Sequence, residues 1–207
     1  YFGSIRSEGL SFLNGAKEVK PFRQIQQDIF LTAYGSYLLN LVDVAIEDHL
    51  YDPHLYSFTQ QALMQLDNGS DPEIITNIFE LQLLQRFGVA PQLDHCAVCG
   101  NQEGPFDYSS KYAGLLCQRH FEMDRYRWHV NPRGLYLARL LMQISYEQIN
   151  SIQVKAETKQ NLRHFIDQLY EEYVGIHLKS KKFIDDMQSW SKLLMPKADE
   201  KKEPNEE

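Results

Sequence analysis

The chain has only three cysteines in 207 residues, and Cys96, Cys99 and Cys117 fall within one short stretch. An odd number of cysteines leaves one thiol unpaired, so these residues cannot form a closed disulfide framework. Reduced thiols that gather in one stretch instead indicate a metal site in a reducing, cytoplasmic environment.

Several other features are absent from the sequence. It has no apolar run that approaches the ~18 residues of a membrane span, and it has no secretory signal. It contains no P-loop, GxGxxG, GxSxG or HExxH motif, so we expect a protein that is not an enzyme. Because it starts at Tyr1 rather than at Met, we also expect a fragment or a processed chain.

Positive charge is missing from a long part of the chain. Between Gln24 and Gln85 there are nine acidic residues and no lysine or arginine, whereas Lys111–Leu140 holds six basic and two acidic residues. The formal net charge of −7 argues against a general nucleic-acid binder. The segregation fits two interpretations, namely ordinary solvated faces or a basic face that meets a polyanion.

Residues for such a basic face lie around the second half of the chain. Some of them are interleaved with Tyr126 and Trp128, and aromatic rings beside cations can stack on single-stranded nucleic acid. Alternatively, Trp128 packs against the module around the cysteines. The candidate nucleic-acid contacts are Arg119, Arg125, Arg127, Arg133, Lys179, Lys181 and Lys182.

The cysteines follow the spacing of a zinc site. Cys96-x2-Cys99 is followed by seventeen residues and then by Cys117-x2-His120. Zinc ribbons use gaps of this size, and three thiolates with one imidazole favour zinc in a tetrahedral shell. Four protein ligands leave no open position for a water molecule, so a single Zn²⁺ per chain would be structural. His95, beside Cys96, is the alternative fourth ligand.

Two other groups of charged residues are better explained as solvated helix surface than as sites. They are Glu47, Asp48 and Asp52 with the neighbouring His49 and His54, and the pair Glu171 and Glu172.

Apolar residues follow a helical period over most of the chain. Asp-Pro or Asn-Pro pairs predict helix starts at Asp52, Asp71 and Asn131, and Gly88 predicts a stop. Asn14-Gly15 predicts a hairpin turn between residues 9–13 and 16–19. The expected helices span about 23–48, 53–68, 72–87, 132–144, 156–173 and 183–194, and two short strands are expected at 106–108 and 114–116.

We therefore expect a mainly α protein, a helical bundle domain with an inserted zinc-ribbon-like knuckle and a short N-terminal β segment. The expected division is 1–22 for the β segment, 23–88 and 131–196 for the helical domain, 89–130 for the zinc-binding module and 197–207 for a disordered tail.

Four stretches of the chain resemble the RecO family of bacterial recombination mediators. They are DIFLTAYGSYLLNLVD from Asp28, DNGSDPEIITNIFELQLLQRFGVAPQLDHCAVCG from Asp67, GLLCQRHFEMDRYR from Gly114 and LYEEYVGIHLKSKKFIDDM from Leu169. The resemblance covers most of the chain from about Asp28 to Leu194.

The resemblance implies an N-terminal OB-fold, a helical domain and a zinc-binding insertion. Residues 1–22 would be the last strands of a truncated OB-fold. It also implies a non-enzymatic DNA-repair factor that binds single- and double-stranded DNA and anneals complementary strands. Such a factor works in the cytoplasm, at the nucleoid, with RecR and the single-strand-binding protein to load RecA.

His120 departs from the family pattern, because members with the zinc module usually show four cysteines. The histidine keeps a zinc ligand but changes the charge of the site from −2 to −1. A second interpretation of the chain is a zinc-ribbon helical adaptor that binds only protein, which the acidic first half suits equally. A zinc deaminase would need an HxE half-site with an open metal position, and none is found near Cys96–Cys99.

Overall fold

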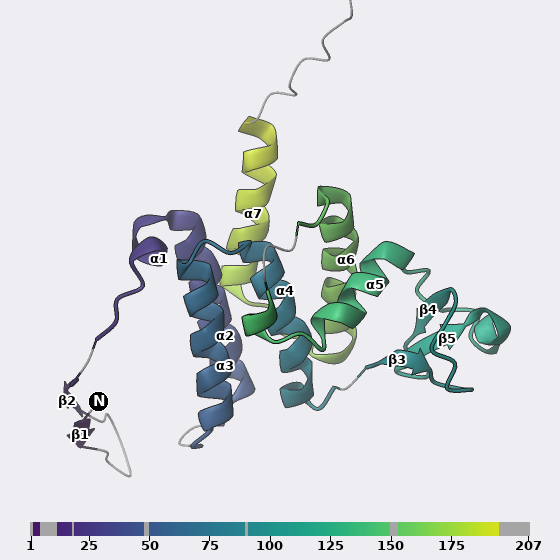
Figure 1. Cartoon of the computed structure of the whole chain (residues 1–207), viewed down its shortest axis with the longest axis horizontal. Helices are drawn as coiled ribbons and strands as arrows, with labels where there is room; N and C mark the ends of the chain where they lie inside the picture. Colours follow the sequence, from purple (N-terminus) through teal and green to yellow (C-terminus); the bar gives the residue numbers. More distant parts are fainter. Residues whose placement is uncertain are drawn as a thin grey trace, which may run out of the picture.

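The computed structural model describes residues 2–4, 12–17, 19–47, 50–89, 91–149 and 153–194. Helices account for most of these residues, and a small sheet lies at one end of the molecule (Figure 1). No described helix is both long and apolar enough to cross a membrane. The tail predicted at 197–207 lies outside the described residues.

The elements follow one another along the chain with these bounds. The helices are α1 Arg23–Gln27, α2 Ile29–Ala45, α3 Pro53–Asp67, α4 Pro72–Leu83, α5 Pro132–Leu141, α6 Ala156–Tyr173 and α7 Lys179–Leu194. The strands are β1 Phe2–Ser4, β2 Phe12–Gly15, β3 Gln92–Cys96, β4 Phe106–Ser109 and β5 Gly114–Cys117. Short 3₁₀ helices are η1 Leu84–Phe87, η2 Gln118–Met123 and η3 Tyr146–Gln148.

Side-chain caps explain where the helices begin. Asp52 and Asp71 each accept hydrogen bonds from backbone N–H groups of the first turn, and a proline follows each of them. Asn131 caps α5 in the same way, so the three predicted starts are confirmed. Gly88 ends η1 in the left-handed region, with φ of 73°, which confirms the predicted stop.

The single helix expected over residues 23–48 is wrong, because the chain breaks at Asp28. This residue is extended, and its carboxylate caps α2 by accepting from the N–H of Phe30 at 2.7 Å. Asp67 at the end of α3 accepts from the N–H of Gln24 at 2.8 Å and so holds the start of α1. The apolar period continues through the break, but local capping by Asp28 outweighs it.

The N-terminal strands pair differently from the prediction. β1 is antiparallel to β2, with Gly3 opposite Leu13. Asn14 and Gly15 therefore belong to a strand, and the hairpin turn predicted at these two residues is wrong. A two-residue turn signal is local, and pairing with an upstream strand overrides it.

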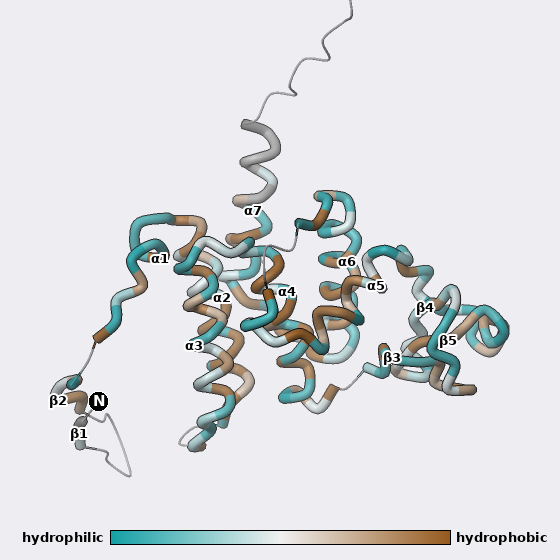
Figure 2. Tube along the Cα trace, viewed as in Figure 1, coloured by the Kyte–Doolittle hydropathy of each residue, from teal (hydrophilic) through white to brown (hydrophobic). Residues whose placement is uncertain are grey.

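The helix α4 lies among the other helices and forms the centre of the core (Figure 1). It packs against α2, α3, α5 and α6. Its apolar residues Ile74, Ile75, Ile78 and Phe79 are buried, and Figure 2 shows this helix largely in the hydrophobic colour. The central position predicted from its apolar surface is confirmed.

The cysteine-rich module forms a separate three-stranded sheet with the order β3-β5-β4. β4 and β5 are antiparallel, which confirms the two predicted short strands, and β3 joins β5 in parallel. Gly114 permits the close approach of β5 to β3, since an added Cβ would lie 2.9 Å from the backbone oxygen of Gln92. The α5 helix begins after this module and ends at Leu141, so it does not reach the predicted end at 144.

Candidate metal centre

Four side chains converge where β3, β5 and η2 meet. Cys96, Cys99, Cys117 and His120 offer ligand atoms that all lie within 4.8 Å of one another. The Sγ atoms of Cys99 and Cys117 are 3.8 Å apart. Nδ1 of His120 is 3.3 Å from Sγ of Cys117 and 3.5 Å from Sγ of Cys96.

These distances match the edges of a metal-centred tetrahedron. With Zn–S near 2.3 Å and Zn–N near 2.0–2.1 Å, two sulfurs lie about 3.8 Å apart and a sulfur and a nitrogen about 3.5–3.6 Å apart. The observed spacings agree within a few tenths of an ångström. All four ligand atoms lie within 4.8 Å of one another, so the residues present fit a tetrahedral metal ion.

Two tight turns place the ligands. Gly100, with φ of 71°, curls the chain after the first cysteine pair, and its N–H donates to the carbonyl of Cys96 at 2.9 Å. The N–H of Cys96 donates in turn to the carbonyl of Asn101 at 2.8 Å. On the other side, Cys117 ends β5 and His120 follows within η2.

The backbone of these turns favours a charged sulfur at Cys96. Burial raises the pKa of Cys96, but backbone N–H groups of Cys117, Val98 and Cys99 together with His120 lower it to about 6. Hydrogen bonds to Cys117 and Cys96 raise the pKa of His120 above its usual value. Both shifts favour the charged forms of the two side chains, and a metal ion that binds the imidazole nitrogen would displace its proton.

Arg119 lies next to the cluster. Its Nη2 is 3.6 Å from Sγ of Cys99, and its hydrogen bond to Cys117 and the charge of Cys99 raise the pKa of the guanidinium. Three thiolates and a neutral histidine around a divalent ion carry a net charge of −1, which the guanidinium offsets. Arg119, predicted as a nucleic-acid contact, therefore contacts a sulfur of the metal site.

The structure distinguishes the two candidate histidines. His120 belongs to the cluster, and His95 contributes no ligand atom to it. In the described part of the chain, no metal-ligand cluster includes Glu47, Asp52 or His54. Asp52 instead caps α3 and pairs with Arg86. Asp48 and His49 lie outside the described residues.

A ring contact fastens the module to the helical domain. Tyr108 of β4 is fully buried, with its ring centroid 4.5 Å from that of Trp128 and 5.4 Å from that of Phe165 in α6. The hydroxyl of Tyr108 donates to the hydroxyl of Tyr173 at 3.0 Å. Trp128 therefore packs between the module and α6, as one of its two interpretations predicted.

A buried carboxylate reinforces this junction. Asp107 accepts from the N–H of Val130 at 3.0 Å and pairs with Nε of Arg127 at 3.0 Å. The guanidinium of Arg127 also lies over the ring of Phe121, at 4.5 Å from its centroid. Neither Asp107 nor Tyr108 belongs to a recognisable motif, so their roles could not be predicted from the sequence.

Comparison with known proteins shows the family of this chain. The family described as Recombination protein O C terminal matches residues 26–182. A protein of Enterococcus faecalis named DNA repair protein RecO is 60% identical over 194 residues, which are 94% of this chain and 74% of that protein. The chain belongs to the RecO family.

Two further RecO proteins show the same extent of similarity. DNA repair protein RecO of Lactococcus lactis is 48% identical over 92% of this chain and 76% of its own length. The protein of the same name from Streptococcus suis is 46% identical over 94% of this chain and 75% of its own length. The resemblance of the sequence to RecO is thus confirmed.

The structure separates the basic residues predicted for this RecO chain. Arg125 is exposed and has no ion-pair partner in the described part of the chain, whereas Arg127 is mostly buried against Asp107. Arg133 is exposed, and its only described ion pair is a long one, 3.9 Å, to Glu157. Tyr126 is 91% exposed beside Arg125.

The lysines of α7 lie apart from the module. Lys179 and Lys182 are exposed, and Lys181 pairs with Asp185 at 2.6 Å and with Asp167 of α6 at 3.3 Å. α7 packs against α2, and Figure 1 draws α6 between α7 and the three strands. These lysines therefore do not extend the basic surface of the module.

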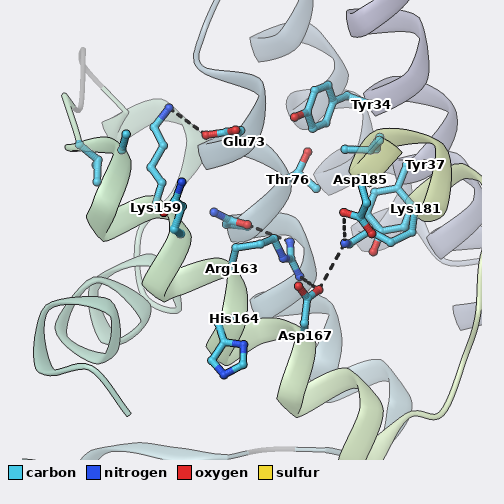
Figure 3. Close-up of a pocket in the computed structure, with 15 residues that line it drawn as sticks. Tyr34, Tyr37, Glu73, Thr76, Lys159, Arg163, His164, Asp167, Lys181 and Asp185 are labelled. Atoms are coloured by element: carbon cyan, nitrogen blue, oxygen red, sulfur yellow. Dashed lines mark hydrogen bonds and ion pairs between the residues drawn. The ribbon is translucent and has the colours of Figure 1, made fainter. Parts of the chain in front are cut away.

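A pocket of about 470 Å³ lies between α4, α6 and α7 (Figure 3). Its cations are paired with acids, since Lys159 contacts Glu73 at 3.1 Å and Arg163 contacts Asp167 at 2.9 Å. Lys181 and Asp185 close the pocket on the α7 side. Charge pairs across this pocket connect α6 to α4 through Lys159 and Glu73, and α6 to α7 through Asp167 and Lys181.

Proposed function

We propose that this chain is the helical and zinc-binding part of a DNA repair and recombination mediator without enzymatic activity. Membership of the RecO family supports a role in DNA repair. In the proposed role the whole protein binds single- and double-stranded DNA, anneals complementary strands and acts with RecR and the single-strand-binding protein to load RecA. It does so in the cytoplasm, at the nucleoid.

The proposed metal is one structural Zn²⁺ per chain, held by Cys96, Cys99, Cys117 and His120. The observation that supports it is the tetrahedral spacing of the four ligand atoms. Bound there, zinc would supply folding free energy to the module and no reaction chemistry, because protein ligands fill all four positions.

The proposed DNA contact is the exposed surface of the module around Arg125, Tyr126 and Arg133. The observation that carries this proposal is that Arg125, exposed and without an ion-pair partner in the described part of the chain, lies next to the exposed ring of Tyr126. A phosphate near Arg125 would release counterions, and the ring of Tyr126 can stack on an unpaired base. The N-terminal β1–β2 pair would belong to an OB-fold that provides the larger part of single-strand binding.

The experiment is fluorescence anisotropy of a labelled single-stranded oligonucleotide across a salt series, with Arg125→Glu as the variant. We expect about tenfold weaker binding and a salt slope that is smaller by about one. Lys179→Glu is the matched control, since it makes the same charge change at an exposed position on α7. Equal effects of the two reversals would contradict a contact localised on the module.

An adaptor function that involves only protein partners is the alternative, and one surface favours it. Tyr56 of α3 and Leu39 of α2 are 64% and 51% exposed, Asp43 is exposed on α2, and Glu47 is exposed two residues after the end of α2. Apolar side chains in an acidic setting suit a basic protein partner. Oligonucleotide binding that is undetectable at low salt, with the zinc bound, would favour this function.

A further inference from the structure

Exposure distinguishes one thiol of the metal cluster from the others. Cys96 and Cys117 are buried, whereas Cys99 is exposed at the outer side of the cluster. A dissolved oxidant can therefore reach Sγ of Cys99 without any opening of the module. Susceptibility of a thiolate to oxidation follows its exposure and charge.

The surroundings of Cys99 favour both steps of a disulfide-forming reaction. Nη2 of Arg119 lies 3.6 Å from its Sγ, so a cation is present where hydroxide would leave from a peroxide. Sγ of Cys117 lies 3.8 Å away as a second nucleophile. To form a disulfide, the two sulfurs would have to approach to about 2.05 Å.

We propose that Cys99 is an oxidation site, at which a hydroperoxide converts the metal cluster into a Cys99–Cys117 disulfide and so opens the metal site. This inference rests on the proposed zinc site. Two ligands, Cys96 and His120, would remain, and two ligands cannot make the closed tetrahedral shell that holds structural zinc.

The chemistry balances with hydrogen peroxide as the oxidant. The thiolate of Cys99 attacks one peroxide oxygen, the O–O bond breaks, and the products are a sulfenic acid and hydroxide. The thiolate of Cys117 then attacks the Cys99 sulfur, the S–O bond breaks, and a second hydroxide leaves. Two thiolates are oxidised by two electrons, and one peroxide is reduced to two hydroxides.

Cys96 is the less suitable partner, although it stands in the same Cys-x2-Cys pair. It is fully buried, and its backbone N–H and carbonyl are held by Asn101 and Gly100 in the tight turn, whereas Sγ of Cys117 lies 3.8 Å from Sγ of Cys99. The geometry therefore favours Cys117, which meets Cys99 across the two half-sites.

Opening of the site would loosen only the outer part of the module. The ligands join the turn after β3 to η2, whereas β4 remains fastened to α6 through Tyr108 and to residues 127–130 through Asp107. The exposed Arg125 and Tyr126 follow directly after η2, so oxidation would disturb the proposed DNA-contacting surface while the helical domain persists.

The test treats the zinc-loaded protein with hydrogen peroxide and measures zinc release with a chromophoric chelator. Peptide mass spectrometry of the same samples identifies the disulfide. We expect release to accompany a Cys99–Cys117 bond and to reverse with a thiol reductant and added zinc. Cys99→His keeps four ligands but removes the exposed thiol, so release should slow at least about tenfold. Arg119→Gln should slow release by about two- to threefold, with the rate expressed per zinc bound before oxidant is added.

A Cys96–Cys99 disulfide in the wild-type chain would overturn the proposal, as would peroxide-driven release that is equally fast in Cys99→His. Because the mapping is done on the wild-type chain, it decides the matter even if Cys99→His binds zinc poorly. Measuring the zinc content before oxidant is added distinguishes failure of the proposed zinc site from failure of the proposed oxidation. A chain without zinc at that stage overturns the zinc site and this inference together, whereas full zinc with the wrong disulfide overturns only the inference.

Discussion

At the scale of single residues, Glu80 is a buried carboxylate of the helical domain that needs partners for its charge. Its carboxylate is completely buried in α4, where Oε1 accepts from the hydroxyl of Tyr37 at 2.6 Å and from Nη2 of Arg163 at 3.1 Å. Burial raises the pKa of Tyr37, so its hydroxyl stays protonated and donates. The carboxylate thereby connects α2, α4 and α6 in one buried network.

Removal of this carboxylate should be costly. Glu80→Ala leaves Arg163 with less compensation for its charge, and breaking a buried ion pair by removing one partner typically costs about 3–5 kcal/mol. We expect a loss near the lower value of about 3 kcal/mol, because Asp167 still contacts Arg163 at 2.9 Å. The measurement is urea unfolding followed by circular dichroism.

Glu157→Ala is the control for Glu80→Ala, since Glu157 and its partner Arg133 are both exposed and 3.9 Å apart. That change should alter the free energy of unfolding by less than about 1 kcal/mol. Similar costs for the two substitutions would show that the Glu80 network is not a main source of stability.

Residue roles could be predicted where the interacting residues are close along the chain, and not where they are distant along it. The cluster of three cysteines and His120 could be predicted because each pair is close along the chain. The buried Arg127 could not be distinguished from the exposed Arg125 in the sequence, because the difference is the ion pair of Arg127 with Asp107 on β4. Such a pairing depends on tertiary packing, which spacing along the chain does not encode.

At the scale of secondary structure, the junction between β4 and α6 decides how the module is held. Trp128 packs on Tyr108 and on Phe165, and its ring centroid lies 4.5 Å from that of Tyr108 and 5.9 Å from that of Phe165. Trp128→Ala should therefore lower the free energy of unfolding by about 3 kcal/mol through the cavity that it leaves. Zinc content should remain unchanged, because Trp128 contributes no ligand atom to the cluster.

Tyr126→Ala is the matched control, as it removes an aromatic ring only two positions away at a site that is 91% exposed. Its effect on urea unfolding should stay within about 0.5 kcal/mol, while single-strand binding should weaken if the ring stacks on bases. A large stability loss in Tyr126→Ala would contradict the expectation that Trp128 stabilises the fold by packing and that the exposed Tyr126 does not.

Element boundaries were predictable where a side chain closes the backbone locally. Asp52, Asp71 and Asn131 cap the helices that their sequence positions predicted. The break at Asp28 also depends on a cap, but an uninterrupted apolar period concealed it. The strand formed by Asn14 and Gly15 depends on a partner earlier in the chain, and the parallel β3–β5 pairing is likewise non-local.

At the scale of the whole molecule, most buried apolar side chains lie in the helices around α4, and the candidate metal ligands lie in β3, β5, η2 and the turn after β3. The small sheet stands at one end of the molecule (Figure 1), and its buried residues, including Cys96 and Cys117, are continuous with the helical core. The two parts share the junction at Tyr108, which does not involve a ligand. Stability of the helical domain should thus depend only weakly on the metal.

Metal removal provides the test of this separation. Treatment with a strong chelator should leave most of the helical circular dichroism intact, while a protease begins to cut within residues 96–123. His120→Ala should behave like the chelated protein, because a shell of three ligands loses most of the affinity of a closed site. His95→Ala should keep its zinc and its resistance to cleavage, since His95 contributes no atom to the cluster. Loss of most helical signal on chelation would show instead that the sheet and the helices fold as one unit, with the ligands stabilising both.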